Sequence, residues 1–206
     1  RQGPAWASSL FEDAAEYGYG MLLASKANKA LLETLMKNFL DLKLSSPLNE
    51  VFNKWLENNN SFDESKKYAN QMLSLMDEEI ENEDAKKILE RIKALKDYLV
   101  KKSVWIYGGD GWAYDIGFSG VDHVLASGED INIMVFDTEV YSNTGGQSSK
   151  ATPLAAVAKF AASGKKVRKK DLGLMMTTYG YVYVAQIAMG ADQAQTLKVI
   201  KEAESY

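Results

Sequence analysis

The sequence predicts an α/β protein with a mostly parallel sheet flanked by helices, interrupted by an all-helical insertion. Two apolar runs carry the sheet prediction: one ends at Gly108, and the other spans residues 131–136. Each run is short and is followed by polar and turn residues, as expected of buried strands. The insertion is predicted from residues 24–102, where long helical patterns replace the strand-like runs and only one proline occurs.

Composition limits the class of protein. The chain has 206 residues, 46% of them hydrophobic and 25% charged, with a net charge of -4. These values are typical of a folded globular protein and lack the basic excess of a nucleic-acid binder. No apolar run approaches the roughly 20 residues of a membrane span, so we expect no membrane contact and a cytoplasmic location. Because there is no cysteine, disulfides and iron–sulfur ligation within this chain are excluded.

The candidate ligands follow the two predicted strands. GGDG, residues 108–111, follows the first run, and DTEVYSN, residues 137–143, follows the second. Ligands of open parallel sheets bind at these strand ends, so both segments are expected to face one crevice. Mg²⁺ takes about six oxygens, with one or two carboxylates and the rest from water and phosphates. Asp110, the Thr138 side-chain oxygen and the Val140 carbonyl would supply three, and a diphosphate two more.

The glycines around Asp110 suit a phosphate ligand. Gly109 and Gly111 let the backbone approach a ligand closely, and the turn feeds a predicted helix whose N-terminus favours an anion. The Gly-Lys-Ser/Thr of a Walker loop and the G-x-G-x-x-G of a dinucleotide fold are both absent here. Taken singly, Asp110 is as readily explained by turn closure, and residues 143–146 by an ordinary loop. Their combination at this spacing favours a ligand site.

A longer match extends this hypothesis. The strings GGDGWAYDIG, DHVLASGED and DTEVYSNTGGQSSKATP resemble the pyruvate:ferredoxin (or flavodoxin) oxidoreductases, from Trp105 to about Tyr183. The resemblance implies a thiamine diphosphate-binding fold, with Mg²⁺ held by Asp110, by Thr138 where many relatives carry Asn, and by the Val140 carbonyl. Asn143 is implied to lie near the reacting carbon. The implied cofactor-binding residues are Gly109, Asp110, Gly111, Trp112, Thr138, Glu139, Val140, Tyr141, Ser142 and Asn143.

The resemblance also implies an activity for the full-length protein. Pyruvate would be decarboxylated oxidatively to acetyl-CoA and CO2, with coenzyme A as acyl acceptor and ferredoxin or flavodoxin as electron acceptor. Iron–sulfur clusters and the glutamate that activates the aminopyrimidine would come from other domains of the parent chain, which is expected to form a homodimer. The present piece alone is therefore expected to be inactive. A non-redox thiamine diphosphate enzyme, of decarboxylase or transketolase type, and a non-catalytic interaction scaffold remain alternatives.

The expected domain order has three parts. Residues 1–23 begin the thiamine diphosphate-binding domain, residues 24–102 form the helical insertion, and residues 103–206 form the metal-binding α/β core. Because the chain stops within a predicted helix, we expect that core to be truncated at its C-terminus. Ser8 or Ser9 is predicted to cap the first helix.

Three or four helices are predicted to pack as a bundle in the insertion. Ser46-Pro47 and the pair Ser61 and Glu64 are typical of helix starts. The acidic run 77–84 is predicted to be a solvated helix junction, with a recruiting surface for a protein partner as the alternative. The apolar residues at helical spacing are Leu31, Leu35, Phe39, Leu42, Ile88, Ile92, Leu95 and Leu99.

The C-terminal part is predicted to alternate helix and strand. Thr152-Pro153 is expected to open a helix over residues 154–163, followed by a helix over 171–178 and a third strand over 181–187. Asp192 is expected to cap a last amphipathic helix.

Two further features are not assigned to catalysis. A helix over residues 115–127 is predicted to contain His123, the single histidine, for which we expect a structural role. The basic residues of the loop before residue 171 are expected to be solvated, with electrostatic steering of an acidic partner as the alternative. These residues are Lys165, Lys166, Arg168, Lys169 and Lys170.

Overall fold

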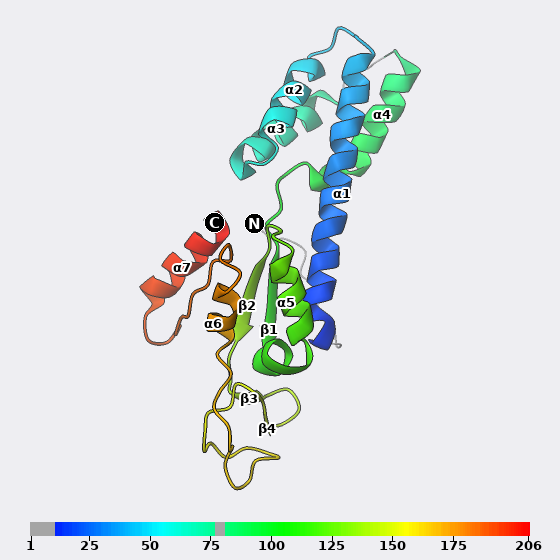
Figure 1. The fold of residues 1–206 in the computed structure, drawn as a ribbon. Coiled ribbons are helices and arrows are strands. Elements are labelled where there is room, and N and C mark those ends of the chain that lie inside the picture. The colour runs from blue at the N-terminus through cyan, green and yellow to red at the C-terminus, as the bar shows by residue number, and fades with distance from the viewer. Residues whose placement is uncertain (1–10, 77–80) are drawn as a thin grey trace. The chain divides into compact units, whose positions relative to one another are not determined.

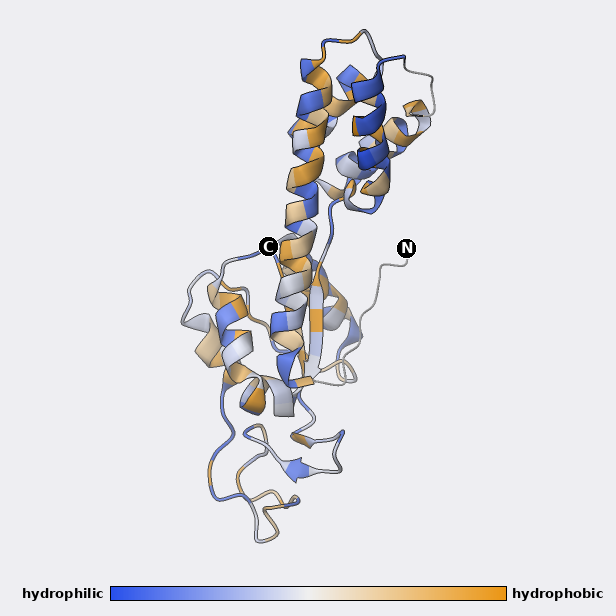
Figure 2. Cartoon of the chain, turned by 90° about the vertical axis from the view of Figure 1, so that its right-hand side faces the viewer, coloured by the Kyte–Doolittle hydropathy of each residue, from blue (hydrophilic) through white to orange (hydrophobic). Residues whose placement is uncertain are grey.

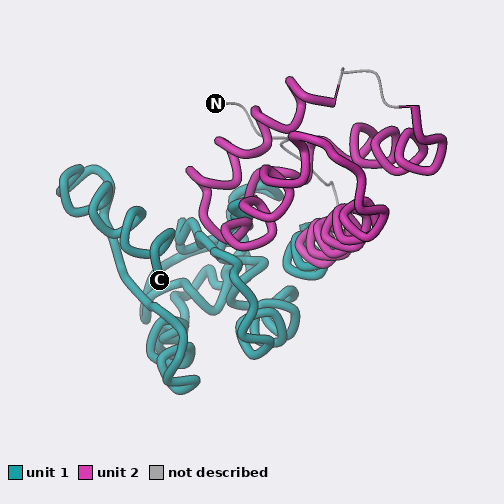
Figure 3. Tube along the Cα trace, turned by 90° about the horizontal axis from the view of Figure 1, so that it is seen from above, with its two compact units in different colours: residues 1–20, 103–206 teal, residues 21–102 magenta. Residues whose placement is uncertain are grey.

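The computed structural model describes residues 11–76 and 81–206. The chain divides into two compact units, one formed by Arg1–Gly20 with Ser103–Tyr206 and the other by Met21–Lys102 (Figure 3). The predicted helix cap at Ser8 or Ser9 and residues 77–80 of the acidic run lie outside the described residues. In the part of the chain that is described, no helix combines the length and hydrophobicity needed to cross a membrane.

The unit of residues 21–102 is built from helices (Figure 1). It contains most of α1 (Ala14–Asp41), then α2 (Leu48–Asn58), α3 (Phe62–Leu75), α4 (Glu83–Ala94) and a 3-10 turn at Lys96–Tyr98. Along α1, hydrophobic residues recur among hydrophilic ones at helical spacing (Figure 2). The predicted helical bundle is therefore confirmed.

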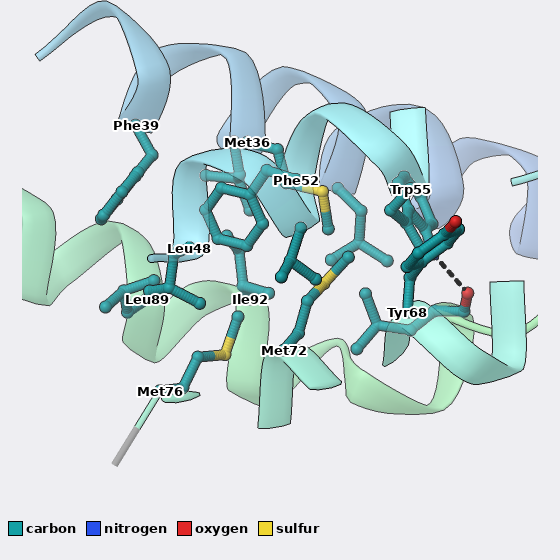
Figure 4. Packing of buried hydrophobic residues seen from close by; sticks show 14 of the residues in the cluster. Met36, Phe39, Leu48, Phe52, Trp55, Tyr68, Met72, Met76, Leu89 and Ile92 are labelled. Atoms are coloured by element: carbon teal, nitrogen blue, oxygen red, sulfur yellow. Dashed lines mark hydrogen bonds between the residues drawn. The ribbon is translucent and has the colours of Figure 1, made fainter. Parts of the chain in front are cut away.

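The bundle has a hydrophobic core of its own (Figure 4). The rings of Phe39 and Phe52 meet edge to face with centroids 5.2 Å apart. The indole Nε1 of buried Trp55 donates a 2.8 Å hydrogen bond to the Leu99 carbonyl, which ties α2 to the end of the unit. All eight apolar residues predicted at helical spacing belong to this core or pack against it.

The predicted helix start at Ser61 is confirmed, whereas the N-cap of α2 is Pro47 and not Ser46. The Ser46 hydroxyl accepts from the Leu48 N–H at 3.2 Å, with Pro47 already in helical conformation. The Ser61 hydroxyl caps α3 by accepting from the Glu64 N–H at 3.4 Å. Asn82, within the predicted junction, caps α4 by accepting from the N–H groups of residues 84 and 85. Glu81, Glu83 and Asp84 are exposed, so the predicted solvated junction is confirmed for its described residues 81–84.

The second unit contains the predicted parallel strands. β1 (Trp105–Gly109) pairs with β2 (Asn132–Phe136) in parallel, and Gly109 lies opposite Phe136. α5 (Phe118–Ala126) lies between them in the chain and supplies the crossover that parallel strands require. Because the two strands end in register, the polar residues that follow each of them begin at the same edge of the sheet.

The two faces of this strand pair have different neighbours. Ile106, Ile133 and Val135 pack into a core with Val121 and Val124 of α5. On the opposite face the rings of Trp105, Tyr107 and Phe136 stack in a row.

Helices approach the pair through specific contacts. A Cβ built on Gly18 of α1 would lie 2.5 Å from Ile106, so the missing side chain allows α1 to pack closely on the core face. Glu204 of α7 (Gln193–Ser205) accepts a 2.8 Å hydrogen bond from the Trp105 indole on the other face. Figure 1 shows α5 and α7 on opposite sides of the strand pair.

The predicted helix over residues 154–163 is wrong. These residues form irregular turns, with Ala155 and Phe160 both at φ 67°. The backbone N–H groups bond to distant partners, as from Ala155 to the Lys165 carbonyl at 2.8 Å and from Lys159 to the Gly146 carbonyl at 3.0 Å. Tertiary hydrogen bonds therefore replace the helical ones that the alanine-rich sequence favours.

The predicted third strand over residues 181–187 is also wrong. A strand needs a hydrogen-bonded neighbour, and in the described part of the chain the parallel sheet has only β1 and β2. Tyr181 instead donates from its hydroxyl to the Ala126 carbonyl. The helices on either side are confirmed as α6 (Leu172–Thr177) and α7, and Asp192 caps α7 by accepting from the Gln195 N–H at 2.9 Å.

Candidate metal site

Three oxygen atoms converge at the ends of β1 and β2. The Thr138 hydroxyl oxygen lies 2.9 Å from Oδ1 of Asp110 and 3.1 Å from the Val140 carbonyl oxygen. Asp110 directly follows β1, Thr138 lies two residues after β2, and Val140 begins the short strand β3 (Val140–Tyr141). The three residues expected from the sequence to form a metal site are thus brought together.

The spacing of these oxygens fits a small hard cation. In an octahedron with metal–oxygen bonds of about 2.0–2.1 Å, neighbouring ligand oxygens lie about 2.9 Å apart. The separations of 2.9 and 3.1 Å are close to that value. Among the described residues no group of three or more His, Cys, Asp or Glu side chains is placed to hold a metal. A site with one carboxylate suits Mg²⁺ that also takes oxygens from phosphate and water.

The environment of Asp110 also favours a cation. Asp110 is only 1% exposed. In the described part of the chain, its carboxylate accepts hydrogen bonds from the hydroxyls of Thr138 and Ser149. A buried carboxylate that lacks a positive partner is costly, because hydroxyl groups replace its hydration only in part. A bound cation would remove that cost.

The turn after Asp110 differs from the predicted helix over residues 115–127. Gly111–Ile116 form a π-helical turn, closed by a 2.8 Å bond from the Gly117 N–H to the Trp112 carbonyl, and α5 then begins at Phe118. Such π turns are frequent at functional sites. The Trp112 ring, 1% exposed, packs against Gly108 and Gly117 in the core, and its Nε1 has no hydrogen-bond partner among residues 11–76 and 81–206. Only the backbone of Trp112 is therefore placed to approach a ligand.

The two glycines beside Asp110 have different surroundings. A Cβ on Gly111 would lie 2.4 Å from Cδ1 of Tyr141, so glycine allows the tyrosine ring to pack on this turn. A Cβ on Gly109 would meet no atom of the described residues within 4 Å, its chain neighbours aside. Burial, followed by the charges of Asp115 and Asp110, raises the pKa of Tyr141. The space over Gly109 is therefore open toward the described residues, whereas the Tyr141 ring fills the space over Gly111.

The loop that carries Thr138 is held in a specific conformation. Glu139 adopts φ 66°, and its N–H donates to the Asp137 carboxylate at 3.2 Å. Asp137 also accepts from the Tyr114 hydroxyl at 3.0 Å and pairs with Lys169. Burial and the hydrogen bond to Asp137 raise the pKa of Tyr114. These contacts fix the loop around Thr138 to the turn that follows Asp110.

Ser142 and Asn143 lie beyond β3 in an exposed turn. The Gly145 N–H bonds to the Ser142 carbonyl at 3.3 Å, and the Gly146 N–H bonds to the Tyr141 carbonyl at 2.8 Å. β4 (Gln147–Ser148) then returns antiparallel to β3, with Ser148 opposite Val140. Asn143 is thus exposed on the same hairpin as Val140.

Sequence reasoning missed three buried polar residues beside this site: Ser149, Thr152 and Lys165. The Thr152 hydroxyl accepts from the Ser149 N–H at 2.9 Å and donates to the Glu139 carbonyl, so its predicted role as a helix cap is wrong. The Lys165 ammonium donates to the carbonyls of Ser149 and Thr152 at 2.6 and 2.7 Å. Burial lowers its pKa. No local pattern marks a lysine for burial within a basic loop.

The prediction of a solvated basic loop is wrong for two further residues. Lys169 pairs with Asp137. The Lys170 ammonium lies 3.1 Å from the centre of the Phe118 ring and donates to the Tyr114 carbonyl at 3.1 Å. Burial lowers the pKa of Lys170. Only Lys166 and Arg168 of the five basic residues are exposed.

His123 lies on α5 and not on the loops that carry the converging oxygens. It is exposed on α5, and its ring meets Tyr19 edge to face with centroids 6.2 Å apart. This packing agrees with the structural role expected for the single histidine.

Comparison with known proteins identifies the family. The family described as "Thiamine pyrophosphate enzyme, C-terminal TPP binding domain" matches residues 92–206, more than half of the chain. The chain belongs to this thiamine pyrophosphate enzyme family. The α/β fold of the matched residues, with its parallel strand pair, is consistent with such a domain.

Named relatives of this thiamine pyrophosphate enzyme domain are much longer proteins. The chain is 54% identical over 204 residues to "Pyruvate-flavodoxin oxidoreductase" of Klebsiella pneumoniae, covering 99% of the chain and 17% of that protein. It is 54% identical over 206 residues to "Pyruvate:ferredoxin oxidoreductase" of Moorella thermoacetica, covering 99% and 18%. It is 45% identical over 206 residues to the mitochondrial "Pyruvate dehydrogenase [NADP(+)]" of Euglena gracilis, covering 100% and 11%. The chain therefore spans less than a fifth of each relative.

Proposed function

We propose that this chain is the thiamine diphosphate- and Mg²⁺-binding part of a pyruvate:ferredoxin or flavodoxin oxidoreductase. The full-length protein would decarboxylate pyruvate oxidatively to acetyl-CoA and CO2. The observation that carries the proposal is the meeting of the Asp110, Thr138 and Val140 oxygens at 2.9 and 3.1 Å. The names of relatives 54% identical over nearly the whole chain support the choice of reaction.

Each proposed site residue has a role within this chain. Asp110, Thr138 and the Val140 carbonyl would hold Mg²⁺, and the backbone of residues 109–112 would lie along the diphosphate. Residues 139–143 would line the rest of the cofactor, with Asn143 near the reacting carbon. Thiamine diphosphate, when bound, supplies the carbanion-stabilising chemistry. The chain's own contribution is to bind the metal and to orient the cofactor.

The remaining functions would lie outside these 206 residues. The chain has no cysteine, so the iron–sulfur clusters of the proposed electron path would be held by other parts of the parent chain. Coenzyme A binding, ferredoxin or flavodoxin reduction, the homodimer and the cytoplasmic location also belong to the proposal for the full-length protein. The isolated chain would be inactive.

The cofactor assignment is tested by Asp110→Ala in the full-length protein. Calorimetric titration with thiamine diphosphate in the presence of Mg²⁺ is expected to show binding to the wild type and none to the variant. Asp41→Asn, an exposed change at the end of α1, serves as the control and should bind normally. Unchanged affinity in Asp110→Ala would contradict the metal assignment.

The reaction is tested by pyruvate-dependent reduction of a viologen dye. The full-length protein should reduce the dye and form acetyl-CoA when coenzyme A is present, and the 206-residue chain alone should do neither. Release of acetaldehyde without dye reduction would indicate the non-redox alternative instead. Because one relative is named for NADP⁺, NADP⁺ should be compared with flavodoxin and ferredoxin as acceptor.

A further inference from the structure

The two carboxylate oxygens of Asp110 have different partners. Oδ1 lies 2.9 Å from the Thr138 hydroxyl, on the side of the proposed metal. Oδ2 accepts a 2.5 Å hydrogen bond from the Ser149 hydroxyl. The Ser149 oxygen in turn accepts from the Ala151 N–H at 3.0 Å, so the serine proton is left to point toward Asp110. Ser149 is only 5% exposed, so water does not compete freely for this bond.

We propose that Ser149 is a positioning residue of the metal site. By holding Oδ2, its hydroxyl orients the carboxylate so that Oδ1 faces Thr138 and the Val140 carbonyl. This inference rests on the proposed function, because it assigns Ser149 a role toward the Mg²⁺ that Asp110 would bind. Residues that hydrogen-bond a metal ligand from behind fix its orientation, and their loss lowers metal affinity.

The segment that carries Ser149 also contacts the loop of residues 138–140, which carries the other two proposed metal ligands. The Thr152 hydroxyl donates to the carbonyl of Glu139, which lies between the two proposed ligands of that loop. The same hydroxyl accepts from the Ser149 N–H at 2.9 Å. Residues 149–152 therefore set the distance between the two loops that supply the metal oxygens.

Lys165 holds this segment in place. Its ammonium donates to the carbonyls of Ser149 and Thr152 at 2.6 and 2.7 Å, and the residue is 9% exposed. Two charge-assisted hydrogen bonds in a buried setting are strong enough to fix both carbonyls. The Ser149 hydroxyl is thereby presented to Asp110 from a rigid support.

The test compares variants of the full-length protein by Mg²⁺ titration at saturating thiamine diphosphate. Ser149→Ala is expected to weaken Mg²⁺ affinity by about 10- to 100-fold. Ser149→Thr keeps the hydroxyl and should restore affinity to within about threefold of the wild type. The control is Ser148→Ala in β4, which should bind Mg²⁺ normally.

Stability is measured in parallel by thermal unfolding without metal. If Ser149→Ala does not fold, Ser149→Cys replaces it, because the thiol has nearly the same shape but is a weak donor. That variant should bind Mg²⁺ at least about fivefold more weakly than Ser149→Thr. A folded Ser149→Ala or Ser149→Cys protein with wild-type Mg²⁺ affinity would overturn the inference.

Asp110→Ala separates this inference from the proposed function. If Asp110→Ala abolishes Mg²⁺-dependent cofactor binding while the Ser149 variants bind normally, only the role of Ser149 is overturned. If Asp110→Ala itself binds normally, the proposed metal site fails, and the positioning role fails with it.

Discussion

The hydroxyl oxygen of Thr138 lies 2.9 Å from a carboxylate oxygen of Asp110, although 28 positions separate the two residues in the chain. The contact arises because β1 and β2 are parallel and end in register, with Gly109 opposite Phe136. Each strand delivers the residues that follow it to the same edge of the sheet. A buried carboxylate and a hydroxyl held at this distance form one edge of the oxygen cluster proposed to bind Mg²⁺.

Replacement of Thr138 should separate the role of its oxygen from that of its shape. Thr138→Val removes the oxygen with little change in volume, and we expect Mg²⁺ affinity in the full-length protein to fall by about tenfold or more. Thr138→Asn keeps a side-chain oxygen and should retain most of the affinity. Titration calorimetry with Mg²⁺ at saturating thiamine diphosphate measures both. Equal affinities in the two variants would argue against Thr138 as a ligand.

Gly109→Ala should affect the ligand and not the fold. The added Cβ meets no atom within 4 Å in the part of the chain that the structure describes, apart from its chain neighbours, so the thermal midpoint of the variant should equal or exceed that of the wild type. If the cofactor occupies the space over Gly109, its affinity should fall by about tenfold, because close approach of a ligand to the backbone requires glycine.

Gly20→Ala in α1 is the matched control, since its Cβ is also unobstructed. It should stabilise the helix by about 0.8–1 kcal/mol and leave cofactor affinity unchanged. A Gly109→Ala protein with normal cofactor affinity would place the ligand elsewhere.

Trp55→Phe should destabilise the helical unit. The substitution leaves the buried Leu99 carbonyl without its 2.8 Å donor, at a cost of about 1–3 kcal/mol. Denaturant unfolding followed by far-ultraviolet circular dichroism measures the change. Trp105→Phe provides the comparison, because Trp105 is only partly buried, and it should cost less. A smaller effect at Trp55 than at Trp105 would contradict the packing in Figure 4.

Tyr179 should stabilise the folded state at neutral pH and lose this effect at strongly alkaline pH. Its hydroxyl donates to Asp122 at 2.5 Å, and this bond, with burial, raises the tyrosine pKa from 10.0 to about 12. Because the folded state holds the proton more tightly, the stabilisation is complete below pH 10.0 and is lost as the pH rises through about 12.

The variant Tyr179→Phe tests this dependence by denaturant unfolding. It should be less stable than the wild type by about 1 kcal/mol near neutral pH, with the difference shrinking above pH 10. Asp122→Asn, which removes the charge of the acceptor, should weaken the pH dependence. A difference that stays constant across the alkaline range would rule out this hydrogen bond as its source.

The sequence predicted best those elements that depend on nearby residues. The helical bundle follows from apolar residues at helical spacing, such as Leu35 and Phe39, which are buried as expected. The strands β1 and β2 follow from short apolar runs bounded by turn residues. The meeting of Asp110 with Thr138 could also be expected, because it needs only parallel strands that end together.

Prediction failed where distant contacts decide the conformation. Residues 154–163 have a helical composition, yet their backbone bonds to Gly146 and Lys165 instead. Lys165 has the side chain of a solvated loop, yet two carbonyls brought close by the fold make its burial possible. The hydrogen-bond partners of residues 154–163 and of Lys165 cannot be recognised from a window of neighbouring residues.

By itself, the sequence determined the α/β class, the helical insertion and the two loop ends that carry the candidate ligands. Those features depend on local hydrophobic periodicity and on glycine and proline positions, which act over a few residues. Only the tertiary structure decided that Ser149 hydrogen-bonds to Asp110 and Thr152 to Glu139. It also decided that Lys165 donates to the carbonyls of Ser149 and Thr152. These contacts join residues 13 to 39 positions apart, and their hydrogen bonds form only after packing has excluded water around them.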